Sequence, residues 1–249
     1  MSTTTVTYIG GPTAILEYAG LRIVTDPTLD PPQVYEEPGT TTLVKTAGPA
    51  LTRADLGPID LVLLSHHSHK DNLDYEGLEL IATGVSTLST RAAASDLFGG
   101  SVEGYDSWED QAIGSITITL VPALHGPPGS EKYTGTVTGF VLEAPGEPTV
   151  YISGDNASIP LVSQIADRFP EIDIALLFAG AARVPRIDGA LTLTSTQAVT
   201  AARILGASRV VGLHTEHWEH FSESRADLEA AFDGSGLLVA TPPGIRVTL

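Results

Sequence analysis

The chain of 249 residues contains no cysteine. It can therefore form neither disulfides nor a thiolate metal site, and any bound metal must be held by histidine and carboxylate side chains. Basic residues are also scarce, because 13 Lys and Arg stand against 30 Asp and Glu, for a formal net charge of −17. That balance opposes binding to nucleic acid, whose backbone requires stripes of Lys and Arg. These absences favour a small-molecule substrate as the partner.

Long hydrophobic runs are absent too. No stretch approaches the roughly 18 consecutive apolar residues of a membrane span, so we expect no membrane partner. The first residues, MSTTTVTYIGG, lack the basic and apolar regions of a secretory signal, which predicts a cytoplasmic protein. The length fits one domain over residues 1–249. Formation of a homo-oligomer is left open.

Short β-rich runs and helical segments alternate along the chain. Runs at 6–9, 14–18 and 21–26 are separated by glycines and predict an opening antiparallel meander. Further strand candidates come at 60–65, 115–123, 136–144 and 149–155, and the remainder alternates strand and helix. The predicted fold class is α/β, a four-layer αβ/βα sandwich in which two packed mixed β-sheets are flanked by helices.

One segment interrupts this pattern. Residues 27–58 carry six prolines and little periodicity. A loop of this length inside a domain is usually functional or disordered. We therefore predict that 27–58 is a lid or pocket wall.

The histidines are clustered rather than scattered. All seven lie in three short windows of the sequence. The first contains His66, His67 and His69, the second His125, and the third His214, His217 and His220. Each window follows an apolar run, as does Asp155 in VYISGD. Strand ends at one edge of layered sheets can bring such residues into one pocket. Imidazole and carboxylate ligands favour Zn²⁺, with Mn²⁺ or Fe²⁺ as alternatives.

Some candidates have an ordinary explanation as well. His217 and His220 lie beyond the strand end, where a surface role is as reasonable as a functional one. Asp26, in VTDP, is typical of a turn before proline. Arg183 and Arg186, in GAARVPRIDG, could clamp a carboxylate or phosphate or could be solvated loop residues.

The ordered motifs HSHKDN, ALHGP, SGD and GLHTEHW resemble the ligand motifs of the metallo-β-lactamase superfamily. GGPTAILEYAGLRIVTDP, YISGD and HTEHWEHF look most like the branch that contains the phosphorylated-ascorbate lactonases and many metal-dependent hydrolases. The resemblance covers nearly the full length. It implies that two of the histidines at 66–69, together with His125, hold one metal. Asp71, Asp155 and His214 would serve a second, with Asp155 bridging.

Two departures from the family motif affect this ligand set. The motif is His-x-His-x-Asp-His, but Asn72 stands where its last histidine is expected. The second site would then be weak, empty or filled by a harder metal, unless the spare member of the His66/His67 pair replaces the missing ligand. The register is also open, because Asp71 selects His67 and His69, whereas the Ser-His that usually ends the strand is Ser65-His66.

The resemblance implies metal-assisted hydrolysis, with Asp71 as the catalytic residue that orients the water or takes its proton. Arg183 and Arg186 are the candidate substrate-binding residues. A lactone or other small anionic ester is the expected substrate, and a phosphodiester is the alternative. A metal-binding protein without turnover is the alternative outside the enzyme class.

Overall fold

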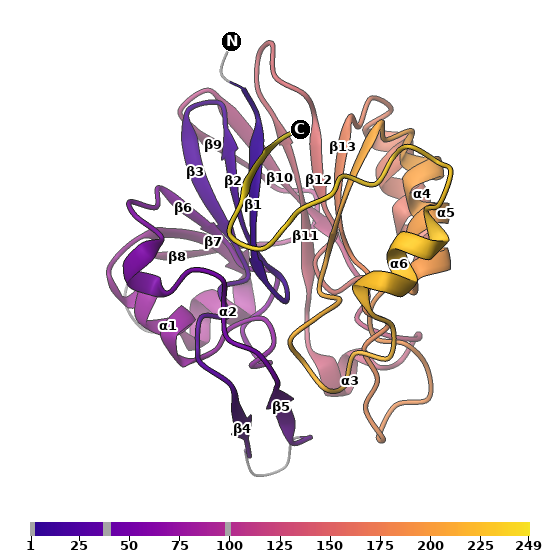
Figure 1. The fold of residues 1–249 in the computed structure, drawn as a ribbon. Coiled ribbons are helices and arrows are strands. Elements are labelled where there is room, and N and C mark those ends of the chain that lie inside the picture. Colours follow the sequence, from indigo (N-terminus) through magenta and orange to yellow (C-terminus); the bar gives the residue numbers. More distant parts are fainter. Residues whose placement is uncertain (1–2, 37–40, 98–100) are drawn as a thin grey trace.

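The computed structural model describes residues 3–36, 41–97 and 101–249, and their main strands form two large sheets (Figure 1). Within this part of the chain, no helix is long and apolar enough to cross a bilayer.

The first sheet has seven strands among the described residues. In order across the sheet they are β15 (Arg246–Thr248), β1 (Thr5–Gly10), β2 (Thr13–Tyr18), β3 (Leu21–Thr25), β6 (Leu61–Leu63), β7 (Ser86–Thr90) and β8 (Val102–Tyr105). The meander expected from the sequence forms β1 to β3, and β3, β6, β7 and β8 then run parallel. This sheet is therefore mixed.

The second sheet is mixed as well and has six strands in the described ranges. Its order is β14 (Arg209–Leu213), β13 (Ile174–Phe178), β12 (Val150–Ile152), β11 (Thr138–Glu143), β10 (Ile116–Pro122) and β9 (Asp110–Ile113). The strands β12, β13 and β14 are parallel, and β9 to β12 are antiparallel.

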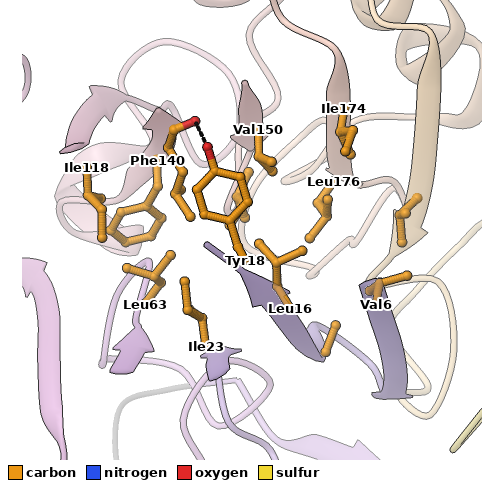
Figure 2. Packing of buried hydrophobic residues seen from close by; sticks show 14 of the residues in the cluster. Val6, Leu16, Tyr18, Ile23, Leu63, Ile118, Phe140, Val150, Ile174 and Leu176 are labelled. Atoms are coloured by element: carbon orange, nitrogen blue, oxygen red, sulfur yellow. Dashed lines mark hydrogen bonds between the residues drawn. The ribbon is translucent and has the colours of Figure 1, made fainter. Parts of the chain in front are cut away.

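Apolar side chains from the facing surfaces of the two sheets form the central core. Figure 2 shows Leu16, Tyr18 and Leu63 of the first sheet packed toward Phe140 and Leu176 of the second. The Tyr18 hydroxyl donates across the core to the carbonyl of Leu142 at 3.4 Å, so its polar end is satisfied. Burial of this kind is the main favourable term in folding.

Helices cover the outer face of each sheet, as Figure 1 shows. On the first sheet lie α1 (Tyr75–Ala82) and α2 (Arg91–Asp96); on the second lie α4 (Ile159–Arg168), α5 (Ser195–Leu205) and α6 (Arg225–Ala231). Thr90 and Ser158 cap α2 and α4, because their side chains accept from backbone N–H groups in the first turns. The predicted helix–sheet–sheet–helix sandwich is confirmed.

The 27–58 segment contains two short strands and a 3₁₀ turn, which its proline-rich sequence does not predict. It forms β4 (Gln33–Tyr35) and β5 (Leu43–Lys45), an antiparallel pair, followed by a 3₁₀ turn, Arg53–Asp55. Residues 37–40 of the segment lie outside the described residues. The pair projects at the same end of the molecule as α3 (Glu131–Thr134) (Figure 1).

Candidate metal centre

Three predicted ligands follow strands of the second sheet that end at the same edge. The strand β10 is antiparallel to β11, which is antiparallel to β12, so β10 runs in the direction of β12 and its parallel neighbours. His125, Asp155 and His214 come shortly after the ends of β10, β12 and β14. Sheet topology therefore accounts for their convergence.

The loop after β6, in the first sheet, contributes the other predicted ligands. Asp26 fixes the backbone at the beginning of this loop by hydrogen bonds. The backbone N–H of Asp26 donates to Leu63 at 3.0 Å, and its carboxylate accepts from the N–H of Ser65 at 2.6 Å. Burial raises the pKa of Asp26 well above its ordinary value, although the Ser65 N–H acts in the opposite direction. Asp26 is thus more than a turn former, because it fixes the backbone that presents His66.

The two sheets approach closely beside the predicted ligands. The N–H of Thr138 donates to the carbonyl of Ser65 at 3.0 Å. Gly154 has φ +54°, and a Cβ there would lie 2.5 Å from the Thr138 oxygen and 2.8 Å from the Ser65 Cβ. Only glycine fits this contact, which places Asp155 beside the loop of the first sheet.

His66, His69 and His125 form the first cluster of candidate ligand atoms. The His66 Nε2 and His69 Nδ1 atoms are 2.9 Å apart, and the His125 Nε2 is 3.2 Å from the same His69 nitrogen. The His125 Nδ1–H donates to the Leu191 carbonyl at 2.8 Å, which leaves the Nε2 atom facing the cluster.

Burial keeps His66 and His69 of the first cluster in the neutral form that a metal requires. It holds the pKa of His66 well below the ordinary value, and the neighbouring His69 and His125 rings add to the effect. Burial, followed by the nearby His125, lowers the pKa of His69 to about 4. The rings therefore offer lone pairs at neutral pH.

Asp71, Asp155 and His214 form the second cluster and are all buried. The His214 Nε2 lies 3.3 Å from the Asp71 Oδ2 and 3.5 Å from the Asp155 Oδ1. Burial alone would raise the Asp71 pKa, but the His220 and His214 imidazoles outweigh it and hold that pKa well below its usual range. Burial lowers the His214 pKa, but Asp155 and then Asp71 outweigh it and raise the pKa above its ordinary value.

Asp155 links the clusters through its two oxygens. Its Oδ1 faces His214, whereas its Oδ2 lies 3.4 Å from the His125 Nε2. The buried Asp155 Oδ2 and His214 Nε2 have no hydrogen-bond partner among the described residues. Unpaired buried polar atoms are costly, and one cation in each cluster would satisfy the Asp155 Oδ2 and the His214 Nε2 in turn. The donor set therefore fits a divalent metal, and Asp155 has the orientation of a bridging ligand.

Six of the seven predicted ligands lie in these clusters, and His67 does not. Its Nε2 lies 3.0 Å from a carboxylate oxygen of Asp96 near the surface, and its side chain is 18% exposed. The expectation that His67 is a ligand, or replaces a missing one, disagrees with this geometry. His66 occupies the ligand position instead, because the hydrogen bond from the Ser65 N–H to Asp26 fixes the backbone so that the His66 ring faces the cluster.

Asn72 is buried in the second cluster, but its side-chain amide acts as a donor. The Nδ2 group donates to the Asp155 Oδ1 at 3.2 Å. The Oδ1 of Asn72 has no hydrogen-bond partner among the described residues. Asn72 thus supports a ligand rather than replacing the histidine of the family motif.

His220 is the residue that the sequence left undecided. Its Nε2 lies 3.0 Å from the Asp71 Oδ2, and its side chain is 12% exposed. The signal was the spacing of three histidines in HTEHWEHF, which did not say which one turns inward. His217 instead packs its ring 6.3 Å from that of Tyr8, away from the clusters.

A cavity of about 220 Å³ opens above the clusters. Its lining includes His69, Asp71, His125 and His220, the 27–58 residues Tyr35, Thr41 and Leu43, and the apolar Val184, Ile187 and Leu191. Arg186 also lines the cavity and lies 4.2 Å from the Tyr133 ring centroid. Arg183 is exposed and outside the lining, so only one of the two predicted arginines reaches the cavity.

Comparison with known proteins agrees with the fold and the donor set. Residues 21–215 match the family described as the beta-lactamase superfamily domain. A metal-dependent hydrolase of the UPF0173 group from Methanoculleus marisnigri is 31% identical over 181 residues, which cover 68% of this chain and 70% of that protein. The chain belongs to this superfamily, and to its metal-dependent hydrolases with the metallo-β-lactamase fold.

Solved structures show the same fold over the full length. A crystal structure described as a possible metal-dependent hydrolase from Veillonella parvula superimposes with a TM-score of 0.87 at 20% identity and covers 100% of both chains. An isothiocyanate hydrolase from Delia radicum gut bacteria gives 0.82 at 20% identity, with 98% of each chain covered. At these identities the likeness concerns the fold alone.

Proposed function

We propose that the protein hydrolyses a small anionic ester or lactone, with Zn²⁺ held by the two clusters and Mn²⁺ or Fe²⁺ as alternatives. The supporting observation is that two sets of convergent ligand atoms lie at the base of a cavity. A cation bound there lowers the pKa of a water from about 15.7 towards 7 and polarises the substrate carbonyl.

The residues of the two clusters have different roles in this proposal. His66, His69 and His125 would hold the first cation, and Asp155 would contribute to both. Asp71 lines the cavity, and the low pKa of its carboxylate keeps it ionised, so it can orient a water and accept a proton.

The cavity wall supports an anionic substrate with an apolar part. Leu43, Val184 and Ile187 provide apolar surface, and Arg186 provides a guanidinium within the lining. A guanidinium binds a carboxylate or phosphate through paired hydrogen bonds. The volume of about 220 Å³ limits the substrate to a small molecule.

The apolar walls also favour a second candidate, a neutral electrophile such as an isothiocyanate. The structural neighbour from Delia radicum gut bacteria is described as an isothiocyanate hydrolase. Such a substrate needs no cationic partner, so Arg186 separates the two proposals.

The test measures turnover of carboxylated lactones, neutral lactones, phosphodiesters and benzyl isothiocyanate with added Zn²⁺, Mn²⁺ or Fe²⁺. We expect Arg186→Ala to raise KM for carboxylated lactones about tenfold and to leave neutral substrates unchanged. Arg183→Ala, on the same loop but outside the cavity lining, is the matched control. Faster turnover of benzyl isothiocyanate, with no effect of Arg186→Ala, would favour the second candidate. No turnover with any metal would contradict both and favour a non-catalytic metal-binding protein.

A further inference from the structure

We propose that His220 is a ligand of the second metal, in place of the histidine that the superfamily motif has at the position of Asn72. This inference rests on the proposed function, because it requires a cation between Asp71, Asp155 and His214. It adds a residue from outside the four strand-end motifs to the site.

The distances around Asp71 carry the proposal. One oxygen, Asp71 Oδ2, lies 3.0 Å from the His220 Nε2 and 3.3 Å from the His214 Nε2. Two ligand atoms bound to one ion at about 2.1 Å are about 3.0–3.4 Å apart when they subtend 90–110°. Both separations match this expectation. Each imidazole thus lies at the distance from Asp71 that one shared ion would give. His220 is not among the residues whose ligand atoms all lie within 4.8 Å of one another, so its ring would have to shift toward Asp155 and His214 to bind the same ion.

Asn72 presents its Nδ2 group to the Asp155 Oδ1 at 3.2 Å, and a donor N–H does not bind a cation. The Asn72 Oδ1, which has no hydrogen-bond partner among the described residues, is an amide oxygen and a poorer ligand for Zn²⁺ than imidazole. His67 cannot supply the missing ligand, because its ring is paired with Asp96 at the surface. Among the described histidines, His220 is the one outside the two clusters that contacts a cluster carboxylate.

Hydrogen bonds to two other segments fix the backbone around His220. The N–H of the preceding residue, Glu219, donates to the carbonyl of Val44 in β5 at 3.0 Å. The carbonyl of His220 itself accepts from the N–H of Arg183 at 2.9 Å. The ring is therefore placed by fixed backbone and not by a mobile tail. Preorganisation of this kind is what a metal ligand requires.

With His220, the second site has two imidazoles and two carboxylates, a set suited to Zn²⁺, Mn²⁺ or Fe²⁺. The second site, which the sequence predicts to be weak, empty or filled by a harder metal, would then bind its ion tightly, and the protein would hold two metals. A simpler role, in which His220 only orients Asp71 by a hydrogen bond, predicts a smaller effect on metal affinity. The experiment separates the two roles.

The test is calorimetric titration of the chelator-stripped protein with Zn²⁺, together with elemental analysis after gel filtration. We expect two sites in the unmutated protein. His220→Ala should weaken one of them by more than about 100-fold, beyond the 10–100-fold effect typical of a residue that only orients a ligand. His67→Ala, which removes a histidine that lies outside both clusters, should leave both sites unchanged. Thermal unfolding of the stripped variants checks that each one folds.

The second part of the test asks whether another variant restores the second metal site. The double variant His220→Ala/Asn72→His should recover the second site, because it restores an imidazole at the motif position. Two sites of unchanged affinity in His220→Ala would overturn the proposal while leaving the metal-dependent function intact. A loss that His220→Gln restores, through a hydrogen bond to Asp71, would also overturn it. No zinc binding by the unmutated protein would instead contradict the proposed function.

Discussion

Burial gives the histidines of the first cluster their chemical character. An imidazole in water is half protonated near pH 6.5, whereas burial, with help from His125, lowers the His69 pKa to about 4. Burial also lowers the His214 pKa, but the neighbouring Asp155 and Asp71 carboxylates outweigh it and raise that pKa above its ordinary value. One residue type thus serves two electrostatic roles a few ångströms apart.

The first prediction concerns pH. Between about pH 6.5 and about pH 4, the unfolded chain protonates His69 and the folded metal-free protein does not. The unfolded state binds more protons in this window, so the free energy of unfolding should fall as pH falls through it. His214 does not oppose this trend, because a group with a raised pKa is protonated in both states below pH 6.5. Urea unfolding with a chelator present, at about pH 7 and about pH 5, measures the fall.

His69→Gln removes one of the titrating groups and should reduce the pH dependence. An unchanged slope in His69→Gln would show that other groups control it. His67→Ala is the control, because that side chain is near the surface and outside both clusters.

At this scale the sequence predicted most of the candidate site. Apolar runs that end in His125, Asp155 and His214 identify strand ends, and strand ends meet at a sheet edge. The choice between His66 and His67 depended on the Asp26 contact to Ser65, which no periodicity shows. His220 depended on a loop in which His214 and His217 have φ of 59° and 76°, and this backbone conformation is not visible in a pattern of residue types.

At the scale of elements, the 27–58 segment differs most from expectation. Its strands are three residues long, too short for an alternating pattern to stand out among prolines. Leu29 and Leu56 belong to the core cluster under α1, so the segment is part of the fold at both ends. The predicted role as a lid or wall stays a prediction, and Tyr35, Thr41 and Leu43 are the residues through which it would act.

A buried ion pair anchors the hairpin to α1. The Lys45 ammonium lies 2.8 Å from Asp74, and the two side chains are 1% and 0% exposed. Asp74 also caps α1 by accepting from the N–H of Gly77. Lys45→Met would leave the Asp74 charge buried without a partner, so we predict a loss of about 3–5 kcal/mol in the free energy of unfolding.

The exposed pair of Arg53 and Glu76 offers a matched control at the start of the same helix. Arg53→Met should cost less than about 1 kcal/mol, because water screens exposed charges. Denaturant unfolding of both variants gives the comparison. Equal losses would show that burial does not set the strength of the Lys45 pair.

At the scale of the whole molecule, the candidate site lies where the two sheets join. The first sheet provides His66, His69 and Asp71, and the second provides His125, Asp155 and His214. The sandwich was predictable, because strand runs recur in both halves of the sequence and both faces of each sheet require cover. The single domain, cytoplasmic location and absence of nucleic-acid or membrane partners stay predictions.

A metal held between the sheets should stabilise the whole fold. Binding to the folded state alone adds about 2.7 kcal/mol at a free metal concentration of about 100 times Kd. We therefore predict that Zn²⁺ raises the Tm of the stripped protein by several degrees. The triple variant His66→Ala/His69→Ala/Asp155→Ala should lose this increase, as differential scanning calorimetry can measure. An equal increase in that variant would place the metal elsewhere.

The presence of a metal centre is tested most directly by anomalous diffraction at the zinc, iron and manganese edges, on crystals of protein purified without added metal. We predict two peaks, one among His66, His69 and His125 and one among Asp71, Asp155 and His214, with ligand distances of about 2.0–2.2 Å. The same maps show whether the His220 Nε2 binds the second ion. Crystals without an anomalous peak at either cluster, even after soaking in Zn²⁺, would contradict the claim that these residues form a metal centre.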